Sequence, residues 1–452
     1  MELSFNIKHQ FCFTSMQQLE LFPEPFSSVS ASTGGKVINQ INPADSPFHS
    51  WYRLVLSFPP HLVRHYISRF EVQPGQTLLD PFCGTGTTLV EAQLQGISGC
   101  GIEANPMAHF ASQVKTSWHL NPHQLIQHAE EIAEIVSACS EFHQPAAVRS
   151  LPAETDKLLL KNSISPLPLH KALMLLEHID ASQDSRFRQH ERLALAQATV
   201  LHCSNLRFMP EVGIRRQKRT DVPLLEHWLA TVRKMAADLM QSQIHTQSNL
   251  TPSRIYRADA RQLGSIISPA SLDGVFTSPP YPNEKDYTRA TRLETVLLGF
   301  IHNRADLRAL KQNLLRSNSR GVYSQDDDDA WIAQYPDIQT IAAEIEQRRL
   351  DLGKTSGFAR LYGRVTKLYF GGMARHLACL RNYLKPGAQL GYVVGDQASY
   401  LQVLIRTGQL LARIADSLGY EVVDIDLFRT RLASVTQQQM REEVLILRWP
   451  GH

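Results

Sequence analysis

The residues best suited to chemistry in this sequence lie in the stretch Asp273-Gly-Val-Phe-Thr-Ser-Pro-Pro-Tyr281. Its apolar part predicts the end of a buried strand, which leads through Thr277 and Ser278 into two prolines and an aromatic ring. Proline has no N–H and fixes φ at about −65°, so the carbonyls of Ser278 and Pro279 stay open as hydrogen-bond acceptors. Acceptors beside a stackable ring suit a planar ligand that carries an amino group. A structural Pro-Pro turn with a packed tyrosine is the alternative.

A second candidate ligand site follows the short strand predicted at Thr77-Leu-Leu-Asp80. The loop Pro81-Phe-Cys-Gly84-Thr-Gly86-Thr-Thr88 then leads into a predicted helix over 89–94. Its glycines permit a tight turn and close approach of the backbone to a ligand, and the helix N-terminus offers free N–H groups. A phosphate loop is excluded because Thr87, not lysine, follows the last glycine, and no third glycine completes a dinucleotide fingerprint. A structural turn remains the alternative.

Two further predicted strands end in carboxylates. The strand Ser98-Gly-Cys-Gly-Ile-Glu103 ends about 20 residues after Gly84, where a nucleotide-binding α/β sheet places an acid against ribose hydroxyls. The strand Ser253-Arg-Ile-Tyr-Arg-Ala-Asp259 also finishes on an acid. Each acid alone could be an ordinary surface residue at a strand end. Strand, glycine turn, helix, strand and acid in this order favour a nucleotide site.

The composition is that of a globular protein with a sizeable core. The chain has 452 residues, of which 43% are hydrophobic and 20% charged, enough for one large α/β domain with insertions or for two domains. A net charge of +3 permits a nucleic-acid partner without requiring one. No apolar run is long enough for a membrane span, and we expect no signal peptide, hence a cytoplasmic protein.

The cysteines predict no metal site. They show neither a C-x-x-C pair nor the Cys/His spacing of zinc ligands, so we expect reduced and mostly buried thiols. The six positions are Cys12, Cys83, Cys100, Cys139, Cys203 and Cys379.

These residues require an open sheet to position them. Helices are predicted over 58–67, 293–301, 370–384 and 404–418, with a turn at Lys385-Pro-Gly-Ala388. The strands are predicted at 77–80, 98–103, 253–259, 272–277, 389–394, 421–427 and 442–449, the last two close enough to pair as a hairpin-like edge. Seven strands with helices between most of them predict an α/β fold with a doubly wound, mostly parallel, seven-stranded sheet.

Three segments fall outside this pattern. Residues 1–45 are rich in polar residues and proline around Leu19, Leu21 and Phe22, and predict an irregular arm. Residues 107 to about 250 show helical periodicity over 125–136, 167–179, 192–201 and 224–240, which predicts a mostly helical insertion. Residues 303–335, basic and then acidic at Asp326-Asp-Asp-Asp329, predict a mobile surface excursion. The insertion also holds a cationic run that either is a solvated loop or contacts phosphates, namely Arg215, Arg216, Lys218 and Arg219.

The glycine loop and the Thr277-Ser-Pro-Pro-Tyr281 loop together resemble two motifs of the class I S-adenosylmethionine-dependent DNA amino-methyltransferases, the N4-cytosine/N6-adenine family. Ser57-Phe-Pro-Pro60 is similar to the outlying cofactor motif of that family, and Leu384-Lys-Pro-Gly387 precedes the fifth strand as expected. The resemblance covers about 46–120 and 250–449. It implies a Rossmann-like methyltransferase domain with a cofactor-binding half at 46–120 and a catalytic half at 251–452, separated by the insertion 121–250, a candidate for DNA recognition.

The resemblance also implies roles for single residues. Phe82, Gly84 and Gly86 would wrap the methionine part of S-adenosylmethionine, with Thr87 beside them and Asp80 near its amino group. Glu103 would bind the ribose hydroxyls and Asp259 the adenine amino group. The target base would be held by Ser278, Pro279, Pro280 and Tyr281, with the tyrosine stacked on a flipped base.

The implied activity is methyl transfer to an exocyclic amino group in duplex DNA by direct in-line attack, typical of restriction-modification systems with a cognate endonuclease. Methylation at carbon 5 of a pyrimidine needs a cysteine nucleophile, typically in Pro-Cys, and the sequence has no such dipeptide. Serine before the prolines is more typical of cytosine-N4 enzymes, which we favour over adenine-N6. We also consider an RNA methyltransferase and a non-catalytic nucleic-acid-binding subunit. The insertion and the excursion at 303–335 compete as DNA-reading segments.

Overall fold

The computed structural model describes residues 45–52, 57–209, 211–245, 251–264, 266–432 and 439–451. Contacts divide the chain into two units, residues 1–38 and 39–452, and all described residues belong to the second. The arm predicted at 1–45, with Leu19, Leu21 and Phe22, therefore lies outside the described residues except for Asp45, as does Cys12. In the described part, Cys83, Cys100 and Cys203 are buried free thiols, and no helix is long and apolar enough to cross a membrane.

The centre of the fold is one sheet of seven strands in the order β5-β2-β1-β6-β7-β9-β8. Neighbours from β5 to β7 run parallel, whereas β9 runs antiparallel to both β7 and β8. The predicted mostly parallel, seven-stranded α/β fold is thus confirmed, including the pairing of the last two strands. The bounds are β1 Thr77–Asp80, β2 Ser98–Ile102, β5 Arg254–Tyr256, β6 Leu272–Thr277, β7 Leu384–Gly395, β8 Glu421–Leu432 and β9 Gln439–Arg448.

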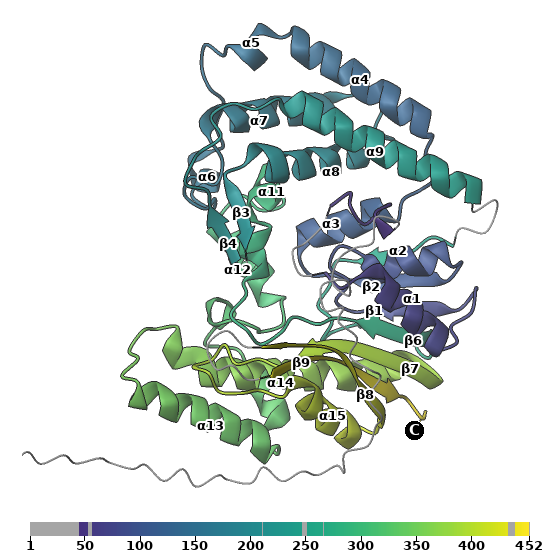
Figure 1. Ribbon diagram of the computed structural model, residues 1–452, viewed down its shortest axis with the longest axis vertical. Helices are drawn as coiled ribbons and strands as arrows, with labels where there is room; N and C mark the ends of the chain where they lie inside the picture. The colour runs from purple at the N-terminus through teal and green to yellow at the C-terminus, as the bar shows by residue number, and fades with distance from the viewer. Residues whose placement is uncertain are drawn as a thin grey trace, which may run out of the picture. The chain divides into compact units, whose positions relative to one another are not determined.

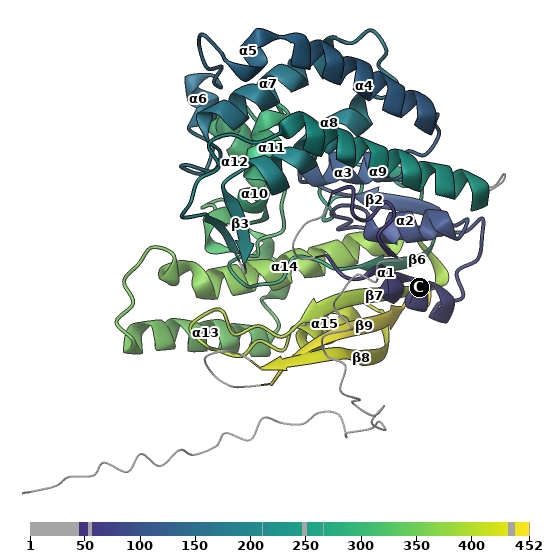
Figure 2. The same cartoon turned by 45° about the horizontal axis from the view of Figure 1, so that its top comes forward.

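Helices cover both faces of this sheet, because the inner strands are apolar on both sides. On one face Leu78 and Phe276 pack with α1 (Pro60–Arg69) and α2 (Thr87–Leu94). On the other face Leu79 and Val275 pack with α14 (Tyr362–Leu380) and α15 (Thr407–Ser417). Figures 1 and 2 show these helices on opposite sides of the sheet. The sheet is therefore doubly wound, with its strand ends free to form a site.

A layer of helices follows β2 in the chain and builds a second core around Trp118, Leu175 and Trp228. Within it α3 and α8 pack against each other, and Figure 1 shows the layer beside the sheet domain. Its elements are α3 Pro106–Lys115, α4 Pro122–Ala138, α5 Ser140–His143, α6 Ala153–Asp156, α7 Pro166–Ala181, α8 Arg188–Ala198, η2 Thr199–Cys203 and α9 Leu224–His245.

Helical periodicity did not predict the two-stranded hairpin β3 (Leu206–Met209) and β4 (Glu211–Ile214), which leaves this layer. Its apolar side chains pack against Leu293 of α11, and β4 contacts α10. The hairpin therefore reaches the segment that directly follows the Pro-Pro-Tyr loop.

The remaining elements link β6 to β7. They are α10 Tyr287–Ala290, α11 Arg292–Leu297, α12 Arg304–Gln312, η3 Ser319–Gly321, η4 Asp328–Ile332, α13 Pro336–Asp351, η5 Ala359–Leu361 and η6 Arg381–Tyr383. The turn predicted at Lys385–Ala388 lies inside β7, where the register with β6 shifts and Gly387 has φ of 84°. The sequence signal for a turn thus marks an irregularity at the start of a long strand.

Candidate active site

One cavity of about 530 Å³ opens where the parallel strands end. It brings together residues that lie far apart in the sequence. Of the predicted site residues, those that line it are Phe82, Gly84, Thr87, Glu103, Asp259, Ser278, Pro279, Pro280 and Tyr281. Ser57, Phe58 and Pro59 of the outlying motif line it as well. Asp80, Gly86 and the cations Arg215, Arg216, Lys218 and Arg219 are not among the lining residues.

The glycine loop between β1 and α2 has the backbone conformation that its composition predicts. Gly84 has φ of 52° and Gly86 has φ of 83°, in the left-handed region that glycine adopts readily. A Cβ on Gly86 would lie 3.0 Å from Cβ of Ser112 in α3, so this position also needs a small residue. α2 begins at Thr87 and no side chain caps it. Its first N–H groups therefore face the loop without a side-chain acceptor.

Glu103 closes this loop from the end of β2. Its Oε2 accepts from the N–H of Gly84 at 2.8 Å, and its Oε1 accepts from the N–H of Asn105 at 2.7 Å. Burial raises the pKa of Glu103 to about 7, although backbone donors, among them Asn105, Gly84 and Ala104, favour the ionised form. Each carboxylate oxygen has a further lone pair. The side chain can thus still accept from a pair of ribose hydroxyls.

Asp80, expected near the amino group of the cofactor, also makes contacts within the protein. It is fully buried behind the cavity wall, and its Oδ1 accepts from Oγ1 of Thr277 at 2.6 Å and from the N–H of Phe82 at 3.2 Å. Burial raises its pKa to about 6. Asp80 therefore joins β1 to the strand that carries the Ser-Pro-Pro-Tyr loop.

That loop leaves β6 and forms one wall of the cavity. Oγ of Ser278 donates to the carbonyl of Val393 on β7 at 3.1 Å. The ring of Tyr281 lies against Gly395, where an added Cβ would come within 3.2 Å of Cε2. Burial raises the pKa of Tyr281 above its ordinary value, so its hydroxyl stays protonated at neutral pH. Strand β7 thus holds both the serine and the aromatic ring in place.

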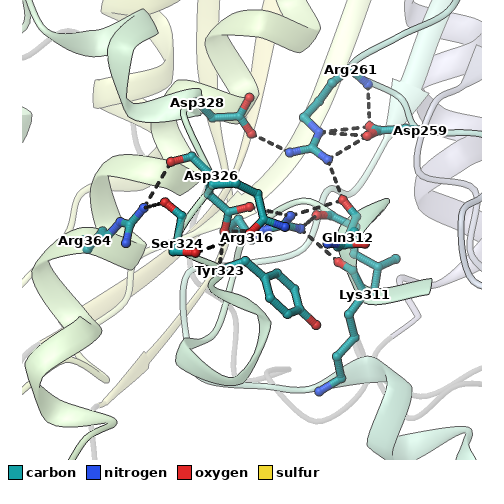
Figure 3. A network of polar contacts seen from close by, with 12 residues as sticks. Asp259, Arg261, Lys311, Gln312, Arg316, Tyr323, Ser324, Asp326, Asp328 and Arg364 are labelled. Carbon is teal, nitrogen blue, oxygen red and sulfur yellow. Dashed lines mark hydrogen bonds and ion pairs between the residues drawn. The ribbon is translucent and has the colours of Figure 1, made fainter. Parts of the chain in front are cut away.

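Asp259 lies in the loop after β5 and is held by an arginine that no sequence motif singles out. Arg261 donates to it from Nε at 3.0 Å, from Nη2 at 2.6 Å and from its backbone N at 2.9 Å. A guanidinium bound in this way fixes the plane of the carboxylate. Figure 3 shows that the guanidinium of Arg261 donates to Asp328 as well as to Asp259.

Part of the segment 303–335, predicted as a surface excursion, is buried and lines the cavity. Arg316 is only 4% exposed because it pairs with Asp326 at 2.8 Å. Lys311 pairs with Asp286 at 2.8 Å beside the Pro-Pro-Tyr loop. Charged residues normally lie on the surface, but Arg316 is buried and Lys311 half-buried, and each has a partner of opposite sign. Lining residues that the sequence motifs do not contain include Asn283, Lys285, Asp286, Tyr287, Lys311, Arg316 and Asn318.

The cationic run after β4 divides into two kinds of side chain. Arg215 and Arg219 donate to carbonyls of their own hairpin region, Leu206 at 3.1 Å and Leu201 at 2.8 Å. Lys218 donates to the carbonyl of Arg215, whereas Arg216 is exposed. Three of the four cations therefore support the loop itself; Arg215 and Arg216 are both exposed, whereas Lys218 and Arg219 are half-buried.

Known proteins that are similar to this chain are methyltransferases. The family described as "RMKL-like, methyltransferase domain" matches residues 59–151, which include the glycine loop and Glu103. The Type II methyltransferase M.BsoBI of Geobacillus stearothermophilus is 25% identical over 86% of this chain and 82% of its own length. The Type II methyltransferase M.AvaI of Anabaena variabilis is 21% identical over 90% of this chain and 86% of its own.

A solved structure, the rRNA methyltransferase aviRa from Streptomyces viridochromogenes, aligns with a TM-score of 0.33 and 10% identity over 90% of this chain and 93% of its own. The sheet order, the motif-bearing cavity and the methyltransferase relatives agree with one another. The chain is a class I S-adenosylmethionine-dependent methyltransferase, with S-adenosylmethionine as its methyl donor, and it is related to the type II methyltransferases.

Proposed function

We propose that this enzyme methylates the exocyclic N4 amino group of cytosine in double-stranded DNA, in the cytoplasm, as the modification partner of a cognate restriction endonuclease. One observation carries the proposal: the glycine loop with Glu103 and the Ser-Pro-Pro-Tyr loop line the same cavity. The type II methyltransferases that resemble it over most of their length support a DNA substrate. Ser278 before the two prolines supports cytosine-N4 over adenine-N6.

The residues present suit the cofactor. Glu103 can accept from the ribose hydroxyls, Asp259 from the adenine amino group, and the loop Phe82–Gly86 allows close approach of the methionine part. When bound, S-adenosylmethionine supplies an electrophilic methyl group on a sulfonium. The residues of the glycine loop would hold that end of the cofactor, and the Ser-Pro-Pro-Tyr loop would hold the acceptor base.

The base-side residues would orient the amino group. A flipped base stacks on the ring of Tyr281, and the amino group donates to Ser278 or to the open carbonyl of Pro279. Donation by the amino hydrogens leaves the nitrogen lone pair aimed at the methyl group, so orientation alone permits in-line transfer. No covalent intermediate with the protein is needed. After transfer the amino group loses one proton to solvent or to an adjacent acceptor.

We assign contact with DNA to the insertion, through the hairpin β3–β4 and the cationic run that follows it. The run consists of Arg215, Arg216, Lys218 and Arg219. The contact of β4 with α10 supports this, because α10 follows the catalytic loop. The cavity-lining part of 303–335 would contact the flipped base.

The test is to incubate the purified enzyme with S-adenosylmethionine and duplex DNA, and to analyse the digested nucleosides by mass spectrometry. We expect N4-methylcytosine. N6-methyladenine would move the assignment to adenine, and methylation of RNA alone would reject a DNA substrate. Expression in a methylation-free host followed by sequencing of the genomic DNA for modified bases would give the recognition site. No modified base in either assay would support a non-catalytic subunit.

A further inference from the structure

Arg261 contacts two carboxylates that belong to different parts of the site. One side of its guanidinium holds Asp259. Nη1 donates to Asp328, and Nη2 also donates to the carbonyl of Gln312 at 3.3 Å. Arg261 is 7% exposed and Asp328 is 3% exposed, so the bridge is shielded from water. Figure 3 shows Arg261 lying between Asp259 and Asp328.

The partners of Arg261 opposite Asp259, which are Asp328 and the carbonyl of Gln312, flank a segment that forms one wall of the cavity. Residues 313–318 line the cavity together with Lys311 and Gly321. Gln312, whose carbonyl Arg261 holds, directly precedes this run, and Asp328 follows it. The loop has a second anchor in the pair Arg316–Asp326 at 2.8 Å. Arg261 thus links this wall to the carboxylate expected to bind adenine.

Helix α14 makes room for the bridge. A Cβ on Gly372 would lie 2.5 Å from Cδ1 of the cavity-lining Leu315, 3.2 Å from Oδ2 of Asp328 and 3.5 Å from Cδ of Arg261. A Cβ on Gly371 would overlap the carbonyl oxygen of Asp328. Glycine inside a helix costs up to about 1 kcal/mol relative to alanine. Helix α14 nevertheless has two glycines, Gly371 and Gly372, at the point where Asp328 lies against its backbone.

We propose that Arg261 is a positioning residue which orients Asp259 for the adenine amino group and couples cofactor binding to the cavity wall at 311–321. The proposal rests on the assignment of Asp259 within the proposed function. With Arg261 bound to both of its oxygens, Asp259 keeps lone pairs in a fixed direction for one more donor. A donor bound there restrains Arg261, and through it Asp328 and the Gln312 carbonyl. Coupling of this kind is reciprocal, so an ordered wall also favours the cofactor.

The first test measures recognition of the adenine amino group. Binding of S-adenosylhomocysteine is compared by calorimetry with binding of its analogue in which a carbonyl oxygen replaces that amino group. We expect the native enzyme to prefer S-adenosylhomocysteine by about tenfold, the order of one well-oriented hydrogen bond. Arg261→Lys, which loses the two-pronged geometry, should reduce the preference to less than about threefold. Asp328→Asn should also reduce the preference for S-adenosylhomocysteine. It serves as a second variant if Arg261→Lys does not fold.

Arg375→Gln is the matched control, because Arg375 contacts the other oxygen of Asp328, at 3.1 Å. It should keep the tenfold preference. A purely structural role of Arg261 would weaken both ligands equally and leave the preference unchanged in Arg261→Lys, and that result would overturn the positioning role.

The second test measures the coupling by amide hydrogen exchange at residues 311–321. Adding S-adenosylhomocysteine should slow exchange there at least threefold in the native enzyme and in Arg375→Gln, but not in Arg261→Lys. No change in the native enzyme would overturn the coupling. Neither test contains nucleic acid. If both give the expected results but the enzyme does not modify DNA, only the proposed substrate is rejected. Methylation of DNA without the adenine preference rejects only the role of Arg261.

Discussion

The backbone N–H of Gly84 donates to the carboxylate of Glu103 at 2.8 Å, and this bond joins the turn after β1 to the tip of β2. The acid that is expected to bind ribose therefore also holds the glycine loop in its left-handed turn. Because one side chain serves both purposes, its charge state should control cofactor binding.

Cofactor affinity should fall as the pH decreases from 8 to 6. The pKa of Glu103 is raised to about 7 by burial, so near pH 6 the carboxyl is mostly protonated and loses acceptor capacity. We expect roughly tenfold weaker binding at pH 6 by calorimetry, since one pH unit below a pKa leaves about a tenth of the group ionised. The same pH dependence in Glu103→Gln would remove Glu103 from the site.

The contribution of Glu103 to folding stability changes with pH in the opposite direction to its contribution to cofactor affinity. Its folded-state pKa lies above its ordinary value of 4.5, so that contribution is present below pH 4.5 and is lost as the pH rises through about 7. Denaturation of the cofactor-free protein at several pH values would separate this effect from the effect on affinity.

Gly86→Ala should destabilise the fold more than Gly75→Ala. Both positions have left-handed φ, 83° and 87°, and each substitution carries a conformational cost of about 1–2 kcal/mol. Only at Gly86 would the new Cβ meet another residue, Ser112, whereas at Gly75 nothing lies within 4 Å. Thermal denaturation should show the larger loss for Gly86→Ala, with weakened cofactor binding. Equal losses for the two variants would mean that Ser112 gives way.

Ser278→Ala and Tyr281→Ala should each reduce kcat about 100-fold while leaving cofactor affinity within about threefold. Stacking of a base on an aromatic ring is worth about 1–3 kcal/mol, and Tyr281→Phe, which keeps the ring, should retain most activity. Thr407→Val is the control for Ser278→Ala. Like Ser278, Thr407 has a hydroxyl that donates to a carbonyl of β7, that of Gly395, but Thr407 does not line the cavity. Equal loss of cofactor binding and activity in the two alanine variants would contradict their base-side roles.

Arg216→Ala should lower the slope of log K against log salt for DNA binding by about 1, as expected for loss of one phosphate contact. Arg186, exposed and paired with Asp184 elsewhere in the insertion, provides the matched control. Replacing all four cations should flatten the slope further but also destabilise the hairpin, since Arg215 and Arg219 hold its carbonyls. An unchanged slope for Arg216→Ala would make the run a solvated loop.

The sheet could be predicted because its signals are local. Each inner strand is a short apolar run that ends at a polar or glycine-rich loop, and parallel strands place those ends at one edge. The cavity lining at Glu103, Asp259 and Ser278 followed from that rule. Asp80 also ends a strand, but its contact with Thr277 is a tertiary one that the strand pattern does not contain.

Other features could not be predicted from the sequence. They depend on contacts between residues far apart in the chain, or on segments too short to show a periodic pattern. The strands β3 and β4 have four residues each, which is too few to show a two-residue period beside long helices. Arg316 and Asp328 are charged, and the composition of their segment predicts a surface position. They are buried because Asp326 and Arg261 compensate them, and pairing of this kind is invisible to composition.

The pairing of β1 with β6 has a consequence for biosynthesis. Thr277 and Asp80, whose hydrogen bond fastens these strands, are 197 residues apart. While the ribosome makes the helices in between, β1 has an unpaired edge on the side that β6 will occupy. Contacts of such long range form slowly and leave strand edges open to aggregation. A chain truncated before β6 would thus expose the free edge of β1, and chaperone binding to this edge in nascent chains should fall once residue 277 has left the exit tunnel.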